Sequence, residues 1–138
     1  MKGVSFKKLL SVLVSITVIL SIAPSTFAYS DGVSITNGVT NYTPSHYKNT
    51  GSGVYTCRLL SATTDGFSSG NRIYARIRRS SDNSKAGDMA TYTSAPQGQY
   101  FSYWYGYGDP RDYKIAVNDL YNHTFTAYLL WSPDQITT

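Results

Sequence analysis

The sequence predicts an all-β protein, an antiparallel β-sandwich of about seven to eight short strands that follows a cleaved helical signal peptide. The chain contains no glutamate and is rich in tyrosine, serine, threonine, asparagine and glycine, a composition typical of strands and turns. Apolar and polar residues alternate in several short runs, and turn-forming residues separate these runs every ~8 to 12 positions. These observations favour strands and indicate no helix after the leader.

Residues 1–28 have the pattern of a secretory signal peptide. Lysines precede an apolar run over residues 9–22, which is followed by Pro24, and small residues suited to a signal peptidase end at Ala28. The run has fewer than the ~17 residues that a membrane-spanning helix needs. We therefore expect residues 29–138 to form one secreted domain, free or associated with the cell surface, without stable membrane insertion.

The net charge of +4 belongs to the whole chain. Three of the twelve basic residues lie in the leader, which leaves nine basic and eight acidic residues in the predicted domain and a net charge of +1. Such a balance does not indicate a nucleic-acid partner.

The first elements of the predicted domain are a hairpin and a connection. Runs 33–36 and 39–42 flank Asn37-Gly38, a dipeptide typical of a type I′ turn, so a short hairpin is the simplest interpretation. The polar segment 43–53 is expected to be a connection.

The next strand is expected over residues 54–60, with Tyr55, Cys57 and Leu59 on one side. Cys57 is the only cysteine, so no internal disulfide can form. Its apolar neighbours favour a buried thiol, with an intermolecular disulfide as the alternative. Residues 61–71 are expected to form a loop.

Residues 72–79 have the clearest strand pattern. Apolar and polar side chains alternate: Ile73, Ala75 and Ile77 form one face, and Arg72, Tyr74, Arg76 and Arg78 form the other. The arginine stripe is a candidate contact for an anionic polymer such as a wall phosphate or an acidic glycan. Alternatively, the arginines pair with aspartates, stack on tyrosines, or discourage aggregation of strand edges. Residues 80–87 are expected to be a polar loop.

A strand over 89–93 and a turn over 95–98 lead to the most aromatic segment, residues 100–107. A continuous strand would place Phe101, Tyr103, Tyr105 and Tyr107 on one side and Tyr100, Ser102 and Trp104 on the other. The functional interpretation is a platform for sugar rings, and the alternative is cross-strand aromatic packing. The sequence leaves open whether this segment is core or surface.

Two further strands are expected near the C-terminus. Residues 113–117 alternate, and residues 124–131 place Phe125, Ala127, Leu129 and Trp131 on one side. Pro133 ends the last strand because proline cannot donate to a β-ladder.

Candidate catalytic groups are few. His46 and His123 are the only histidines, and neither has a metal-ligand spacing. Without glutamate, a glycosidase would need two aspartates to converge, and Asp109 and Asp119 lie in turn-forming sequence. We therefore predict no catalytic residue, no metal site and no cofactor.

The chain resembles the small exported β-sandwich proteins of Gram-positive bacteria, a group that includes lactococcin-type bacteriocins. The lysine-led leader of residues 1–28, the alternating tyrosine-rich strands and the aromatic final strand ending at Trp131 carry this resemblance. It implies an extracellular β-sandwich with an antimicrobial or cell-surface role, and it transfers no site residue.

The favoured functional hypothesis is non-catalytic binding to a cell-surface or cell-wall component, such as a wall glycan. A bacteriocin-like antimicrobial protein is the second hypothesis and a secreted hydrolase the third. The candidate ligand-binding residues are Arg72, Tyr74, Arg76, Arg78, Tyr103, Trp104, Tyr105 and Tyr107. The identity of the ligand, the producing organism and the oligomeric state stay open.

Overall fold

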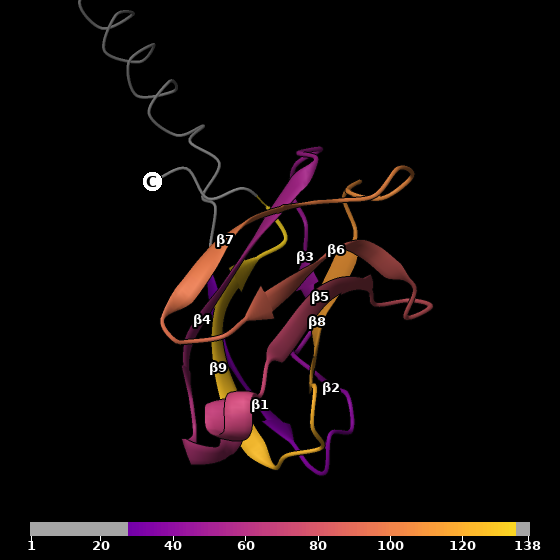
Figure 1. Ribbon diagram of the computed structural model, residues 1–138. Helices are drawn as coiled ribbons and strands as arrows, with labels where there is room; N and C mark the ends of the chain where they lie inside the picture. The colour runs from indigo at the N-terminus through magenta and orange to yellow at the C-terminus, as the bar shows by residue number, and fades with distance from the viewer. Residues whose placement is uncertain (1–27, 135–138) are drawn as a thin grey trace, which may run out of the picture.

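The computed structural model describes residues 28–134, which form two antiparallel β-sheets packed against each other (Figure 1). This part of the chain contains nine strands and one short 3₁₀ helix. In chain order the elements are β1 (Tyr29–Ile35), β2 (Asn41–Tyr42), β3 (His46–Tyr47), β4 (Val54–Ala62), η1 (Thr64–Gly70), β5 (Ile73–Arg79), β6 (Lys85–Tyr92), β7 (Gln97–Ser102), β8 (Asp112–Asp119) and β9 (Phe125–Ser132).

The first sheet has the strand order β1-β9-β4-β7, and the second has the order β2-β8-β5-β6, with β3 also paired to β8. The prediction of an antiparallel all-β sandwich is confirmed at this level. The strand number exceeds the expected seven to eight because β3, only two residues long, lies within residues 43–53, which were expected to be a connection. Most of the predicted signal peptide, residues 1–27, lies outside the described residues.

The turn at Asn37 and Gly38 is present, but the predicted hairpin is wrong. Both residues have positive φ, 50° and 70°, as the turn chemistry requires. Only an isolated bridge between Thr36 and Val39 joins the flanking segments, because β1 pairs with β9 and β2 pairs with β8. The turn therefore carries the chain from one sheet to the other.

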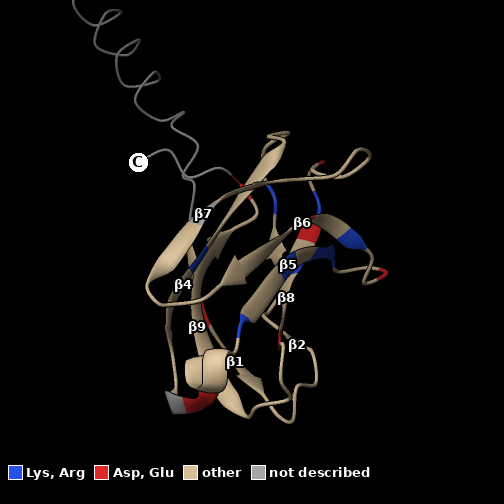
Figure 2. Cartoon of the chain, in the orientation of Figure 1, with Lys and Arg blue, Asp and Glu red and all other residues tan. Residues whose placement is uncertain are grey.

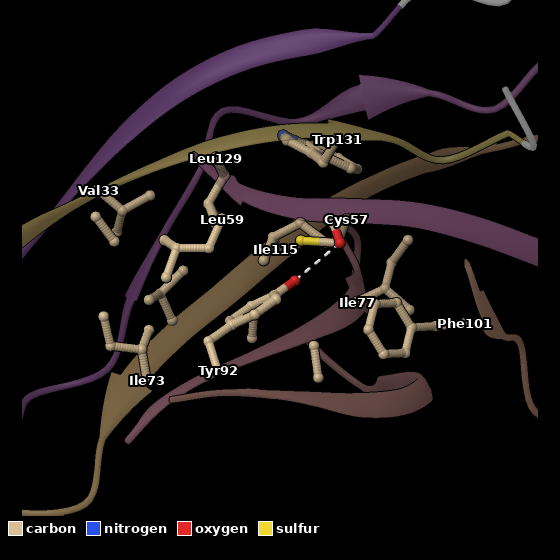
Figure 3. Packing of buried hydrophobic residues seen from close by; sticks show 14 of the residues in the cluster. Val33, Cys57, Leu59, Ile73, Ile77, Tyr92, Phe101, Ile115, Leu129 and Trp131 are labelled. Carbon is tan, nitrogen blue, oxygen red and sulfur yellow. Dashed lines mark hydrogen bonds between the residues drawn. The ribbon is translucent and has the colours of Figure 1, made fainter. Parts of the chain in front are cut away.

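The core lies between the two sheets and is filled by the faces that the alternation predicted (Figure 3). Tyr55, Cys57 and Leu59 from β4 are fully buried, as are Ile73 and Ile77 from β5. A buried hydrogen bond also crosses the core, since the Tyr92 hydroxyl donates to the Cys57 carbonyl at 2.9 Å. Apolar burial on this scale supplies the main driving force for folding.

We expect the Cys57 thiol to resist alkylation in the folded protein. The side chain is fully buried, and this burial raises its pKa to about 12, so the reactive thiolate is scarce near neutral pH. Iodoacetamide should leave the mass unchanged in native buffer and add one label in guanidinium chloride. Native-state labelling at the rate of a small free thiol would contradict this prediction.

The two sheets meet along a seam between β6 and β7. Gly87 of β6 forms an isolated bridge with Tyr103, and the Trp104 amide donates to the Ala86 carbonyl at 2.9 Å. β6 begins at Lys85, so the predicted loop over residues 80–87 is shorter than expected. The turn before β7 contains a cis peptide bond between Ala95 and Pro96.

Candidate functional site

The aromatic segment does not form one continuous strand. β7 ends at Ser102, and the chain then turns, with positive φ at Gly106 (80°) and Gly108 (88°). These two glycines permit the turn because they carry no Cβ. The predicted alternation along residues 100–107 therefore stops at Tyr105, and the candidate residues divide between interior and surface.

Tyr103 is in the core, with 9% of its surface exposed. Trp104 is 40% exposed, Tyr105 is fully exposed at the turn, and Tyr107 is half-buried. The four residues therefore do not form an exposed row, and Tyr103 is not placed to contact a ligand.

Tyr103 lies instead against a buried ion pair that the sequence did not indicate. The Nζ atom of Lys48 is 3.1 Å from Oδ1 of Asp134 and 4.9 Å from the centroid of the Tyr103 ring. Lys48 Nζ also donates to Ser52 Oγ at 2.9 Å and to the Pro133 carbonyl at 2.8 Å. The lysine is fully buried, so these contacts replace its hydration.

The carboxylate of Asp134 is held by further donors. The amides of Asn49 and Thr50 donate to it at 2.9 and 3.0 Å, and the Thr50 hydroxyl donates at 2.6 Å. Burial alone would raise the pKa of Asp134, but the hydrogen bonds from Thr50, Asn49 and Lys48 hold it below its ordinary value. Burial lowers the pKa of Lys48, and its bond to Asp134 opposes that shift. We interpret this cluster as a structural lock between residues 48–52 and the end of β9.

The arginine stripe points outward as expected. Ile73, Ala75 and Ile77 are buried, whereas Tyr74, Arg76 and Arg78 are partly exposed on the outer face of the second sheet. An open groove of about 210 Å³ crosses this face, and its lining includes Tyr74, Arg76, Arg78, Lys85, Met89 and Ala116. Arg72 is exposed just before β5 and does not line the groove.

The strand registers bring further cations to the stripe. Arg78 is opposite Lys114 on β8 and opposite Lys85 on β6, so three cations form a row across three strands. Arg76, two residues earlier on β5, is opposite Ala116 and Met89. In Figure 2, blue segments mark β5 and β6 on this side of the sandwich. We call Arg76, Arg78, Lys85 and Lys114 the cation row; the first three line the groove, and Lys114 lies beside it on β8, opposite Arg78.

Aromatic rings stand beside three cations of this region. The Arg76 guanidinium lies 5.4 Å from the Trp104 ring centroid, and Lys114 Nζ lies 4.3 Å from that of Tyr42. Arg79, which follows Arg78 on β5 and does not line the groove, lies 4.8 Å from the Tyr107 ring centroid. These cation–π contacts restrict the side chains and keep the charges in place. Sequence reasoning missed Tyr42, Lys85 and Lys114, because only the register places them beside β5.

The two histidines each contact one aspartate. His46 Nε2 is 3.2 Å from Asp31 Oδ2, and the His46 ring stacks on Tyr29 with centroids 3.5 Å apart. His123 Nδ1 is 3.2 Å from Asp119 Oδ2. Within residues 28–134, no group of three or more His, Cys, Asp or Glu side chains is arranged to hold a metal ion.

The two aspartates considered for hydrolysis do not converge. Asp119 ends β8, whereas Asp109 precedes its first residue and forms an ion pair with Arg111. An eight-residue strand spans about 25 Å, but paired glycosidase carboxylates lie about 5–9.5 Å apart.

No protein-family model, curated protein or solved structure matches this chain. No helix within the described part of the chain is long and apolar enough to cross a membrane.

Proposed function

We propose that this protein is exported and binds a cell-surface or cell-wall component without catalysing a reaction. The proposed contact surface is the groove on the outer face of β2-β8-β5-β6. The single observation that carries the proposal is the cation row, which has no carboxylate within 4.0 Å among residues 28–134.

Like charges on directly opposed strand positions are destabilising. Lys114, Arg78 and Lys85 occupy such positions on three neighbouring strands, although the predicted domain is almost neutral overall. An arrangement that weakens the sheet is best explained by a ligand that neutralises it. The half-buried ring of Tyr74, which lines the groove, adds apolar contact area.

The composition of the groove supports binding rather than turnover. Arginine and lysine contribute charge and hydrogen-bond donors, but the lining contains no carboxylate, histidine or thiol to exchange a proton. The thiol of Cys57 does not reach the groove either, because its side chain is buried in the core between the sheets.

We expect the protein, produced from its full-length coding sequence, to sediment with purified Gram-positive cell walls at low salt. Replacing both Arg76 and Arg78 with glutamine should reduce the bound fraction at least tenfold, since each charged hydrogen bond contributes about 1.5–3 kcal/mol. Sedimentation assays at several salt concentrations provide the measurement.

Arg58→Gln is the matched control for this experiment. Arg58 is exposed on β4 in the other sheet, so its replacement removes one arginine charge, half of what the double replacement removes, without changing the groove. Equal loss of binding in this variant would point to net charge alone and count against the proposed surface. No sedimentation of the unmodified protein would refute the proposal.

A further inference from the structure

We infer that the ligand of the groove is a linear polymer that carries phosphodiester groups, bound along the cation row. This inference rests on the proposed function and names the chemical class of the ligand. Four features of the groove lead to it: the spacing of the cations, the absence of acidic groups in the lining, the small volume, and the position of the aromatic rings.

The spacing of the cations fits an extended anion. Neighbouring strands lie about 4.8 Å apart, so the backbone positions of Lys114, Arg78 and Lys85 span about 10 Å, and Arg76 adds a charge about 7 Å along β5. A single compact anion reaches only part of this set. A chain with repeated charges can neutralise all four.

Apart from the aromatic rings beside Arg76 and Lys114, no side chain of the described residues forms a hydrogen bond or an ion pair with the cation row. Arg76, Lys85 and Lys114 make no side-chain hydrogen bond or ion pair there, and Arg78 donates to a backbone carbonyl, that of Asn83. Of the carboxylates near them in sequence, Asp88 accepts from the Trp104 indole at 2.9 Å.

Asp82, a second nearby carboxylate, lies 3.5 Å from Arg79 and accepts from Ser84. A third, Asp112, is exposed on β8 two residues before Lys114. None of these three aspartates lines the groove. The four cations therefore keep their capacity to bind an anion, which arginine and lysine both do well for phosphate groups.

The shape of the groove disfavours a bulky ring or a membrane. Its volume of about 210 Å³ is below the ~300–1,000 Å³ typical of small-molecule sites, so it suits a slender chain. Trp104 and Tyr42 each have a ring face next to a cation, which reduces the surface available for stacking on a sugar. A flat bilayer would not follow the concave floor at Ala116. Acidic glycans are also disfavoured, because they carry their carboxylates on bulky rings.

The protein is produced from its full-length coding sequence, and titration calorimetry measures how tightly it binds synthetic poly(glycerol phosphate). Parallel arms use polygalacturonate, inorganic phosphate, and vesicles of phosphatidylglycerol with phosphatidylcholine. We expect the phosphodiester polymer to bind at least tenfold more tightly than each alternative, with affinity that falls as salt rises. Arg78→Gln and Lys114→Gln should each weaken binding about tenfold, and Arg58→Gln should not.

Each outcome decides the inference. Equal affinity for polygalacturonate or for vesicles would overturn the phosphodiester assignment, and equal affinity for inorganic phosphate would overturn the polymer. If walls are bound but poly(glycerol phosphate) is not, the proposed function stands and this inference fails; if neither is bound, both fail. Circular dichroism melts of both variants show whether they fold, and competition by poly(glycerol phosphate) for wall binding tests the inference with the unmodified protein alone.

Discussion

Replacing Lys48 with methionine is expected to destabilise the protein by about 3–5 kcal/mol, because it leaves the buried carboxylate of Asp134 without its cation. The Asp134 side chain is only 5% exposed, so water cannot readily replace the lost ammonium group. The substitution also removes the donors to Ser52 and to the Pro133 carbonyl. Urea unfolding followed by circular dichroism gives the change in the free energy of unfolding.

The ion pair between Arg111 and Asp109 provides the control for this measurement. Both side chains are more than a third exposed, so Arg111→Gln should change stability by less than about 1 kcal/mol. A similar small effect for Lys48→Met would show that the lock between residues 48–52 and the end of β9 contributes little. Asp134→Asn should resemble Lys48→Met, since it leaves the buried ammonium group without its counter-charge.

Gly87→Ala is expected to destabilise the fold by about 3 kcal/mol, at the upper end of the usual overpacking range. An added Cβ would lie 2.6 Å from the Ser102 carbonyl oxygen and 2.9 Å from Cγ2 of Ile77. One neighbour is backbone and the other is a core side chain, so neither can move without opening the seam between β6 and β7. Thermal and urea unfolding of the purified variant measure this loss.

Gly51→Ala is the matched control, because a Cβ there would have no atom within 4 Å. Its effect should stay within about 0.5 kcal/mol. Equal stability of the two variants would mean that the seam at Gly87 is looser than its distances indicate.

Sequence reasoning succeeded where one strand face meets the core. The alternation of residues 72–79 correctly assigned Ile73, Ala75 and Ile77 to the interior, and the same logic placed Phe125 and Trp131 there. Burial of one face fixes such a period-two pattern, so it can be recognised without knowing the partner strand.

The failures have physical causes that local sequence does not contain. The Asn37-Gly38 turn has the expected backbone conformation, but the choice of partner strands depends on contacts with β8 and β9 far along the chain. Lys48 lies in a polar segment that predicted a connection, and its burial depends on Asp134, 86 residues away. Packing against residues far along the chain therefore determined both the strand pairing and the burial of Lys48.

In the candidate site, too, the features that depend on one strand were predicted and those that depend on strand pairing were not. The outward direction of Tyr74, Arg76 and Arg78 followed from β5 alone, whereas Lys85 and Lys114 joined them through strand register. The aromatic segment was harder to predict because β7 ends at Ser102 and the chain then turns through Gly106 and Gly108, so that buried Tyr103 is followed by exposed Trp104 and Tyr105.

The side chain at position 116 sets the depth of the groove. Its methyl group lies between Tyr42 and Arg76 in the register, where a longer side chain would rise toward the level of its neighbours. Exchanging this one residue for leucine would make the surface shallower while leaving every positive charge in place. The depth of the groove and its positive charge thus depend on separate positions, so either could be changed while the other is retained.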